Sequence, residues 1–388
     1  MTVSQAVINP AESRLFKPIQ LGKLRLNHRI ALAPLSRYRN DEQGVPLPFT
    51  TTYYADRAAT PGTLIISEAT NVSHPEEPHG SALITAAQTE AWRRNIQAVH
   101  ARGSFFFQQI WSMGRAGNPD FLASKGLEYR SSSPLPLSAE RPAAPEEMTE
   151  REILDVIQDF VAAAQRALSL GADGVEIHGA HGYLIHQFLS DRSNVRTDRW
   201  GGSVENRSRF LLEIVRALVS AIGAELVGIR LSPFASFQGA DSSDYKAQYG
   251  HVVAELKRMQ VPFAYLHLVE ARADPVTWVT GEAPANRDKS LEYILETWDN
   301  VSPVIVAGGY GPGNAVEAVE GRYGKWDVIV AFGRAFLANP DLVFRVKNGI
   351  PLNAPDRPSF YMPMTEVGYN DYPFSQEYLQ SVKVESSA

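Results

Sequence analysis

The stretch VIVAGGYGPGNAVEAVEGRYGKWDVIVAFGRAF, residues 304–336, holds two short apolar runs, each followed by glycine, with a helical stretch between them. The runs VIVAGGY and DVIVAFGR are continuous rather than alternating, which is typical of strands that are buried on both faces of a parallel sheet. The segment GNAVEAVEG between them has the period of a helix. Strand, helix and strand in this order predict one unit of a parallel α/β fold.

Apolar runs of the same kind recur along almost the whole chain. Six more precede residue 304, which makes eight in all, and they begin at Ile30, Thr63, Phe105, Gly174, Val227 and Phe263. Eight such runs with helices between them predict a (β/α)8 barrel, the TIM-barrel fold. The alternative is a doubly wound sheet, which needs a glycine-rich turn after its first strand, whereas IALAPL runs into SRYRN.

Helical stretches separate the apolar runs. Residues 150–170 place six apolar side chains on one face, and these are Ile153, Ile157, Phe160, Val161, Ala164 and Leu168. Residues 208–223 repeat the pattern and end at Gly223, where a glycine can stop a helix. Residues 244–259 provide the helix before the sixth strand.

Two additions to the barrel are predicted, and all of residues 1–388 are expected to form one domain. Residues 15–29, LFKPIQLGKLRLNHR, indicate a β-hairpin that turns at Gly22 and caps the barrel floor. Residues 112–149 are a long Pro/Ser/Gly-rich insertion after the third strand, which we expect over the catalytic mouth. Residues 373–388 are expected to be a C-terminal tail.

Composition excludes several classes of protein. The net charge of −6 over 388 residues, without a basic run, argues against nucleic acid as a partner. The chain has no cysteine, which excludes disulfides, thiolate nucleophiles and iron–sulfur clusters. No signal peptide or membrane span is expected, because no apolar run approaches 18 residues. We therefore expect a cytoplasmic protein.

The ends of the last two strands predict a phosphate site. Gly308 and Gly309 let backbone N–H groups approach an anion, and Gly333 and Arg334 add another amide and a guanidinium. The loops after strands seven and eight are where barrel enzymes bind phosphate. The alternative is that these glycines only permit tight turns, but a turn does not need the charge of Arg334.

Two polar residues inside apolar strands indicate a flavin. Arg230 in VGIRLSP and Gln109 in FFFQQIW suit the pyrimidine edge of the ring, which presents alternating carbonyl and N–H groups. A buried charge is costly unless it meets a partner. The alternative for Arg230 is therefore a structural ion pair with Glu176 or Glu270.

Three histidines, His178, His181 and His186, stand beside Tyr183 in GVEIHGAHGYLIHQF. They could bind a metal if a third ligand converged with the first two. We expect His186 to face the barrel wall instead, while His178 and His181 can both point into the barrel mouth, so no metal site is predicted.

Residues 171–210, GADGVEIHGAHGYLIHQFLSDRSNVRTDRWGGSVENRSRF, resemble the Old Yellow Enzyme family of flavin-dependent ene-reductases. The similarity runs from LFKPIQLG near residue 15 to DYPF near residue 372. It implies tightly bound, non-covalent FMN, reduced by NADPH or NADH, in a monomer or homodimer. The paired histidines make the chain similar to oxophytodienoate reductases.

The resemblance also implies roles for individual residues. His178 and His181 would hold the carbonyl or nitro oxygen of an activated alkene, and Tyr183 would donate a proton to Cα after hydride reaches Cβ. Substrate-shaping positions would be Trp111, Phe237, Trp278 and Tyr361. The positions that would contact FMN are Pro34, Ser36, Ala69, Gln109, Arg230, Gly308, Gly309, Gly333 and Arg334.

Departures from the family pattern narrow the expected function. Ser36 stands where threonine is commoner in the family and where one subclass has cysteine. Some relatives have phenylalanine in place of Tyr183 and isomerise their substrate instead of reducing it, so Tyr183 argues against isomerase activity here. Arg199 and Trp200 replace an acidic residue and tyrosine, for which we expect a packing consequence only. The expected role is enone reduction in secondary metabolism or detoxification. The alternatives are a flavin-binding or regulatory protein, an isomerase, and a metal-dependent aldolase or hydrolase.

Overall fold

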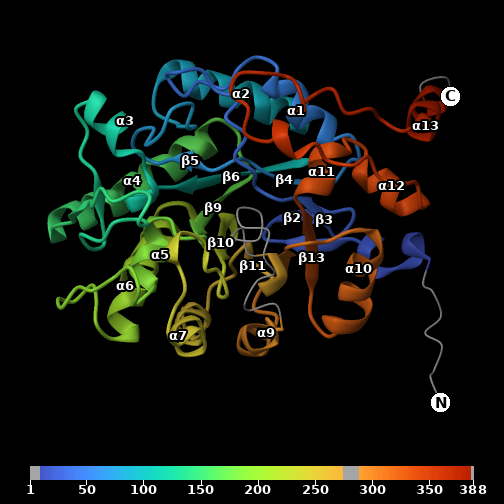
Figure 1. Ribbon diagram of the computed structural model, residues 1–388. Coiled ribbons are helices and arrows are strands. Elements are labelled where there is room, and N and C mark those ends of the chain that lie inside the picture. Colours follow the sequence, from blue (N-terminus) through green and yellow to red (C-terminus); the bar gives the residue numbers. More distant parts are fainter. Residues whose placement is uncertain (1–8, 274–287, 386–388) are drawn as a thin grey trace.

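Eight parallel strands close into a barrel in the computed structural model, which describes residues 9–273 and 288–385 (Figure 1). Neighbours around the ring are β4, β3, β13, β12, β11, β10, β9 and β6, and β6 pairs with β4 to close it. Each strand corresponds to one predicted run, so the (β/α)8 barrel is confirmed. The bounds are β3 Ile30–Leu32, β4 Leu64–Ile66, β6 Phe105–Trp111, β9 Gly174–Gly179, β10 Val227–Leu231, β11 Tyr265–Val269, β12 Val304–Ala307 and β13 Val328–Phe332.

The helices cover the outside of the barrel (Figure 1). Two of the longest begin with a capping box, in which Thr85 pairs with Gln88 and Thr149 with Glu152. α6 ends at Gly223, as the sequence predicted, and this glycine has a φ of 90°. The bounds are α1 Thr50–Arg57, α2 Ala86–His100, α3 Pro119–Ser124, α4 Glu150–Ser169, α5 Leu184–Leu189, α6 Val204–Ile222, α7 Tyr245–Arg258, α9 Glu292–Trp298, α10 Pro312–Glu317, α11 Arg334–Ala338, α12 Leu342–Asn348 and α13 Gln376–Glu385.

The buried face of α4 differs in detail from the prediction. Val161 and Leu168 are only partly buried, whereas Ala163 and Ala167 are fully buried. Small side chains at the centre of the face let the helix approach the strands closely, and the larger apolar ones flank it. The other four predicted positions are buried.

The predicted hairpin caps the floor of the barrel. β1 (Ile19–Leu21) and β2 (Leu24–Leu26) pair antiparallel across Gly22, which has a φ of 53°. The side chains of Ile19, Leu21 and Leu26 pack against residues that point into the lower barrel, including Phe107 and Tyr265. A Cβ on Gly22 would lie 2.3 Å from the carbonyl oxygen of Glu225, so the turn requires glycine.

The insertion after β6 contains short elements rather than an open loop. These are a 3-10 turn at Gly114–Ala116, helix α3, and strands β7 (Arg130–Ser131) and β8 (Glu146–Glu147), which pair in parallel. A further short strand, β5 (Thr70–Asn71), pairs in parallel with the C-terminal end of β6. The predicted C-terminal tail contains α13, which lies at the periphery of the molecule, beyond α12 (Figure 1).

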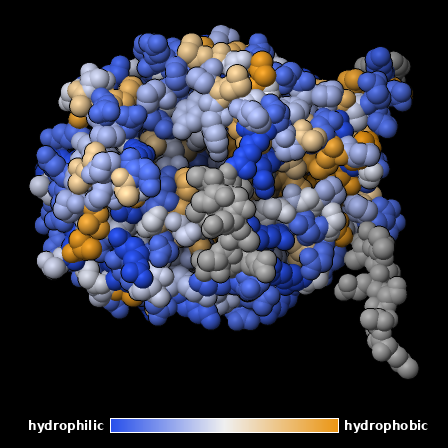
Figure 2. Space-filling model, viewed as in Figure 1, coloured by the Kyte–Doolittle hydropathy of each residue, from blue (hydrophilic) through white to orange (hydrophobic). Residues whose placement is uncertain are grey.

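The face shown in Figure 2 is mostly hydrophilic, with hydrophobic side chains in scattered groups. Within residues 9–273 and 288–385, no helix is long and apolar enough to cross a membrane.

Candidate active site

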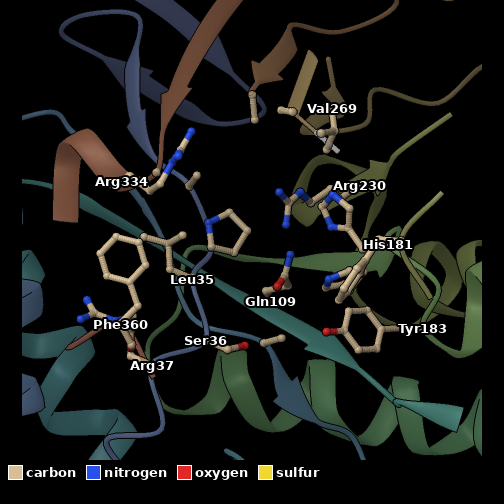
Figure 3. Close-up of a pocket in the computed structure, with 18 of the residues that line it drawn as sticks. Leu35, Ser36, Arg37, Gln109, His181, Tyr183, Arg230, Val269, Arg334 and Phe360 are labelled. Atoms are coloured by element: carbon tan, nitrogen blue, oxygen red, sulfur yellow. The ribbon is translucent and has the colours of Figure 1, made fainter. Parts of the chain in front are cut away.

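A cavity of about 510 Å³ opens at the C-terminal ends of the strands and is lined by side chains from several of them (Figure 3). Trp278, a predicted substrate-shaping residue, lies outside the described residues. Every other predicted site residue lines the cavity, namely Pro34, Ser36, Ala69, Gln109, Trp111, His178, His181, Tyr183, Arg230, Phe237, Gly308, Gly309, Gly333, Arg334 and Tyr361. Arg230, His181 and Tyr183 lie on one side of it and Ser36 and Arg334 on the other, with Gln109 between (Figure 3).

Strand register places a polar layer beneath the cavity. Gln109 of β6 pairs with Glu176 of β9, and Arg230 of β10 lies between His178 and His267 on its neighbouring strands. The carboxylate of Glu176 accepts hydrogen bonds from Gln109 Nε2 at 2.6 Å and from the His267 ring at 2.7 Å. Burial alone would raise the pKa of Glu176, but His267, Arg230 and Gln109 together lower it. Glu176 is therefore ionised, and Gln109 keeps its carbonyl oxygen for an N–H donor.

The Arg230 side chain reaches the cavity without a described ion-pair partner. Within the described part of the chain, neither Glu176 nor Glu270 lies within 4.0 Å of it, and its Nε has no hydrogen-bond partner. The Glu270 carboxylate instead accepts hydrogen bonds from Tyr310 at 2.5 Å and Tyr323 at 2.8 Å. The structural ion pair considered for Arg230 is therefore absent, and its buried cation is available to an anionic or electron-rich ligand.

The opposite end of the cavity is a glycine-lined anion cradle. Gly308 has a φ of 126°, and a Cβ there would lie 2.6 Å from the Cβ of Ala273. Gly333 immediately precedes α11, whose first residue is Arg334. The cradle leaves room for a phosphate close to the backbone. With Arg230 and the Gln109 carbonyl at the other end, these residues fit FMN.

Four aromatic and imidazole rings form a cluster beside the polar layer. The Tyr183 ring centroid lies 4.2 Å from that of Trp111 and 5.0 Å from that of His178. His178 and His181 lie 6.0 Å apart between centroids. The Ala180 N–H donates to His178 Nδ1 at 3.3 Å, so the ring proton is on Nε2. His181 has a left-handed φ of 53°, and its backbone N–H donates to Ser232 Oγ at 2.8 Å.

Burial controls the charge of this cluster. Burial, followed by the positive charge of Arg230, lowers the pKa of both His178 and His181 well below the ordinary value. Both imidazoles are therefore neutral at neutral pH and can each donate one N–H. Burial and then the charge of Glu77 raise the pKa of Tyr183, so its hydroxyl keeps its proton.

His186 does not join the cluster. Its Nε2 lies 2.8 Å from the Ala240 carbonyl oxygen and 3.0 Å from the Tyr249 hydroxyl, on α5 and away from the cavity lining. This position is the scaffold role that the sequence predicted. Throughout residues 9–273 and 288–385, no three His, Asp or Glu side chains are grouped as metal ligands would be.

The cavity also includes residues that were not predicted. Tyr38 lies six residues after the end of β3 and two after the predicted site residue Ser36, so it could have been suspected from that position. Glu77 belongs to a loop after β5 with no periodic pattern. Arg141 comes from the insertion, which places that segment at the mouth as expected. Phe360 comes from the chain beyond α12, about 250 residues from Trp111 in sequence.

Comparison with known proteins identifies the family. Residues 14–353 match the NADH:flavin oxidoreductase / NADH oxidase family. A crystal structure of Old Yellow Enzyme from Pichia sp. superposes with a TM-score of 0.86 at 34% identity, covering 94% of this chain and 95% of that one. The chain belongs to the Old Yellow Enzyme family. It is accordingly a flavin-dependent reductase whose cofactor is FMN and whose reductant is NADPH or NADH.

Two fungal relatives cover nearly the whole chain. A chanoclavine-I aldehyde reductase of Penicillium roqueforti is 44% identical over 374 residues, 96% of this chain and 99% of that protein. A probable inactive reductase of Epichloe festucae var. lolii is 43% identical over 379 residues, 96% and 98% of the two chains. Because a relative named as an aldehyde reductase and one named as a probable inactive reductase are about equally similar to this Old Yellow Enzyme, overall identity does not establish its substrate or mechanism.

Proposed function

We propose that this Old Yellow Enzyme reduces the C=C bond of α,β-unsaturated carbonyl or nitro compounds, with hydride from NAD(P)H reaching Cβ and a proton reaching Cα. The observation that carries the proposal is the ring cluster: two neutral imidazole donors and a protonated tyrosine line one cavity with a buried cation and an anion cradle. We take residues 1–388 as one flavin-binding domain.

His178 and His181 would donate hydrogen bonds to the carbonyl or nitro oxygen of the substrate. Negative charge grows on this oxygen as hydride arrives, and fixed donors that meet such charge are worth about 10²–10³ in rate each. Neutral donors suit the task, because they release no proton of their own to the oxygen at neutral pH. The fixed tautomer of His178 directs its N–H from Nε2.

Tyr183 would deliver the proton to Cα as a general acid. Its raised pKa keeps it protonated before turnover, and its ring packs against both Trp111 and His178. FMN, when bound, supplies the hydride that it has taken from the nicotinamide dinucleotide. Pro34, Ser36, Ala69, Gln109, Arg230 and the glycine cradle would hold it, while Trp111, Phe237, Trp278 and Tyr361 would shape the substrate space.

A rival function is that of an inactive or isomerising relative. The Epichloe relative is named as a probable inactive reductase, so this possibility has a precedent among the similar proteins. Retention of Tyr183 beside two neutral imidazoles favours reduction, because a protein that only binds flavin has no need of a proton donor there.

Purification of the protein tests the proposal. We expect a yellow protein whose flavin absorbance is lost on anaerobic addition of NADPH and returns on addition of 2-cyclohexenone, with cyclohexanone as the product. Reduction by NADPH without reoxidation by enones, maleimides or nitroalkenes would contradict enone reduction while leaving the family assignment intact.

A further inference from the structure

One carboxylate in the cavity has no part in the proposed chemistry. Glu77 lines the cavity together with Tyr38 and Tyr183, and its charge affects the pKa of both tyrosines. It comes from the loop after β5, on the side of the cavity where the insertion lies. A carboxylate beside a developing negative charge would oppose the reaction, so its presence calls for another purpose.

The hydrogen bonds of Glu77 leave one oxygen available. The Tyr38 hydroxyl donates to Oε2 at 3.0 Å, and no donor to Oε1 occurs within the described part of the chain. Arg141 also lines the cavity, but its guanidinium donates to the carbonyls of Ala116, at 3.2 Å, and Gly117. No described cation lies within the 4.0 Å of an ion pair with Glu77, which leaves the carboxylate without a direct counter-ion there.

Aromatic rings surround the same space. Tyr38 and Tyr361 meet edge to face with centroids 6.0 Å apart, and Trp111 and Tyr183 form a second pair at 4.2 Å. All four line the cavity with Glu77. Ring faces attract a cation within about 6 Å, and a carboxylate beside them supplies the charge partner. This combination is suited to an alkylammonium group, whose methyl groups contact the rings.

The space around Glu77 extends beyond the main cavity. Glu77, Ala116 and Arg141 also line a second hollow of about 370 Å³ that reaches α3. A substrate whose reacting carbonyl lies at His178 and His181 therefore has room for a substituent directed toward Glu77.

We propose that Glu77, with Tyr38 orienting it, is a specificity-determining residue that binds a protonated amine on the substrate. The inference rests on the proposed function, because it places the reacting C=C bond of the same molecule at the histidine pair and Tyr183. The favoured substrates are then enals or enones that carry a secondary or tertiary amine.

Burial gives the site a further property. Burial and then the charge of Glu76 raise the pKa of Glu77 to about 7, against the opposing effects of the Tyr38 hydrogen bond and the more distant charge of Arg141. Ionisation of this carboxylate is therefore costly in the free cavity, and a bound ammonium stabilises the ionised form.

Two cinnamaldehydes of nearly equal shape test the proposal. One carries a dimethylaminomethyl group and the other an isobutyl group, each at the meta or para position. With NADPH-reduced holoenzyme at pH 8, where Glu77 is mostly ionised and the amine protonated, we expect kcat/KM to favour the amine at least tenfold. Glu77→Gln should abolish this preference through KM. Asp120→Asn, in the second hollow only, is the matched control and should retain it.

Several results would overturn the inference. The first is equal kcat/KM for the two aldehydes in the wild type, and the second is a preference for the amine that survives Glu77→Gln. The third is a fall in kcat/KM in Glu77→Gln that is equal for both aldehydes, as expected if Glu77 served a proton relay. A rise in KM for NADPH alone would assign Glu77 to the reductant instead.

Calorimetry separates failure of the inference from failure of the proposed function. The saturated alcohols that correspond to the two aldehydes are titrated into the oxidised holoenzyme, which requires no turnover. If the amine alcohol binds more tightly and Glu77→Gln loses this difference, the ammonium site is supported. If in addition neither aldehyde is reduced, only the proposed function fails. Equal binding of the two alcohols overturns the inference.

Discussion

At the scale of residues, the proposed function depends on the charge of two imidazoles. Arg230 lies between His178 and His267 in the strand register, and its charge together with burial keeps His178 and His181 neutral. The same arginine has no described carboxylate within ion-pair distance, and its Nε has no hydrogen-bond partner. In the proposed function this one side chain would therefore keep the donors neutral and also contact the cofactor.

We predict that His178→Ala and His181→Ala each slow flavin reoxidation by 2-cyclohexenone by about 10²–10³, because each removes one donor to the substrate oxygen. His181→Asn retains an N–H donor and should lose less. Stopped-flow absorbance of the NADPH-reduced enzyme measures the rates. Unchanged enone affinity and reoxidation in the double alanine variant would exclude the donor pair.

At the scale of elements, residues 357–370 reach the cavity because buried arginines hold them. Arg39 is fully buried and donates to the carbonyls of Thr365 at 2.8 Å, Ser359 at 3.0 Å and Val367 at 2.9 Å. Its guanidinium also lies 5.1 Å from the centroid of the Tyr369 ring. This planar fork fixes the segment that brings Phe360 and Tyr361 to the cavity.

We predict that Arg39→Lys lowers the free energy of unfolding by about 2–4 kcal/mol, because a single ammonium cannot reach carbonyls in several directions. Urea unfolding measures the loss, and limited proteolysis should cut within residues 357–370. Arg25→Lys, at an exposed position of the hairpin, is the control. Equal stability of the two variants would mean that the segment is held by other contacts.

The barrel strands could be predicted from sequence because burial on both faces gives continuous apolar runs. The site residues at strand ends followed from the same pattern, since parallel strands bring their carboxyl ends to one edge. Glu77 and Phe360 could not be predicted this way, because a loop and the C-terminal segment place them through hydrogen bonds between residues distant in sequence. α13 was missed because its apolar residues, such as Leu379 and Val382, stay exposed.

At the scale of the whole molecule, acid stability depends on histidines that are buried in the neutral form. His28 follows the hairpin at the barrel floor, where its ring nitrogens contact Thr63 Oγ1 at 3.0 Å and the Ile30 N–H at 3.2 Å. Burial lowers the pKa of His28 to about 4. The unfolded chain therefore binds a proton between about pH 6.5 and 4 that the folded chain does not, so this contribution to stability is lost as the pH falls.

We predict that wild-type protein loses about 2 kcal/mol more stability than His28→Gln between pH 8 and pH 5, because glutamine does not titrate. Denaturant unfolding at both pH values measures the difference, in which the titration of the remaining groups cancels. Parallel losses in the two proteins would show that His28 titrates normally.

The most direct test of the central claim is the pair of half-reactions of Tyr183→Phe. Loss of the proton donor leaves the flavin and its reductant in place, so we predict reduction by NADPH within about twofold of wild type. Reoxidation by 2-cyclohexenone, which requires the proton at Cα, should slow by about 10²-fold or more. A variant with slow reduction by NADPH and normal reoxidation by the enone would contradict the account.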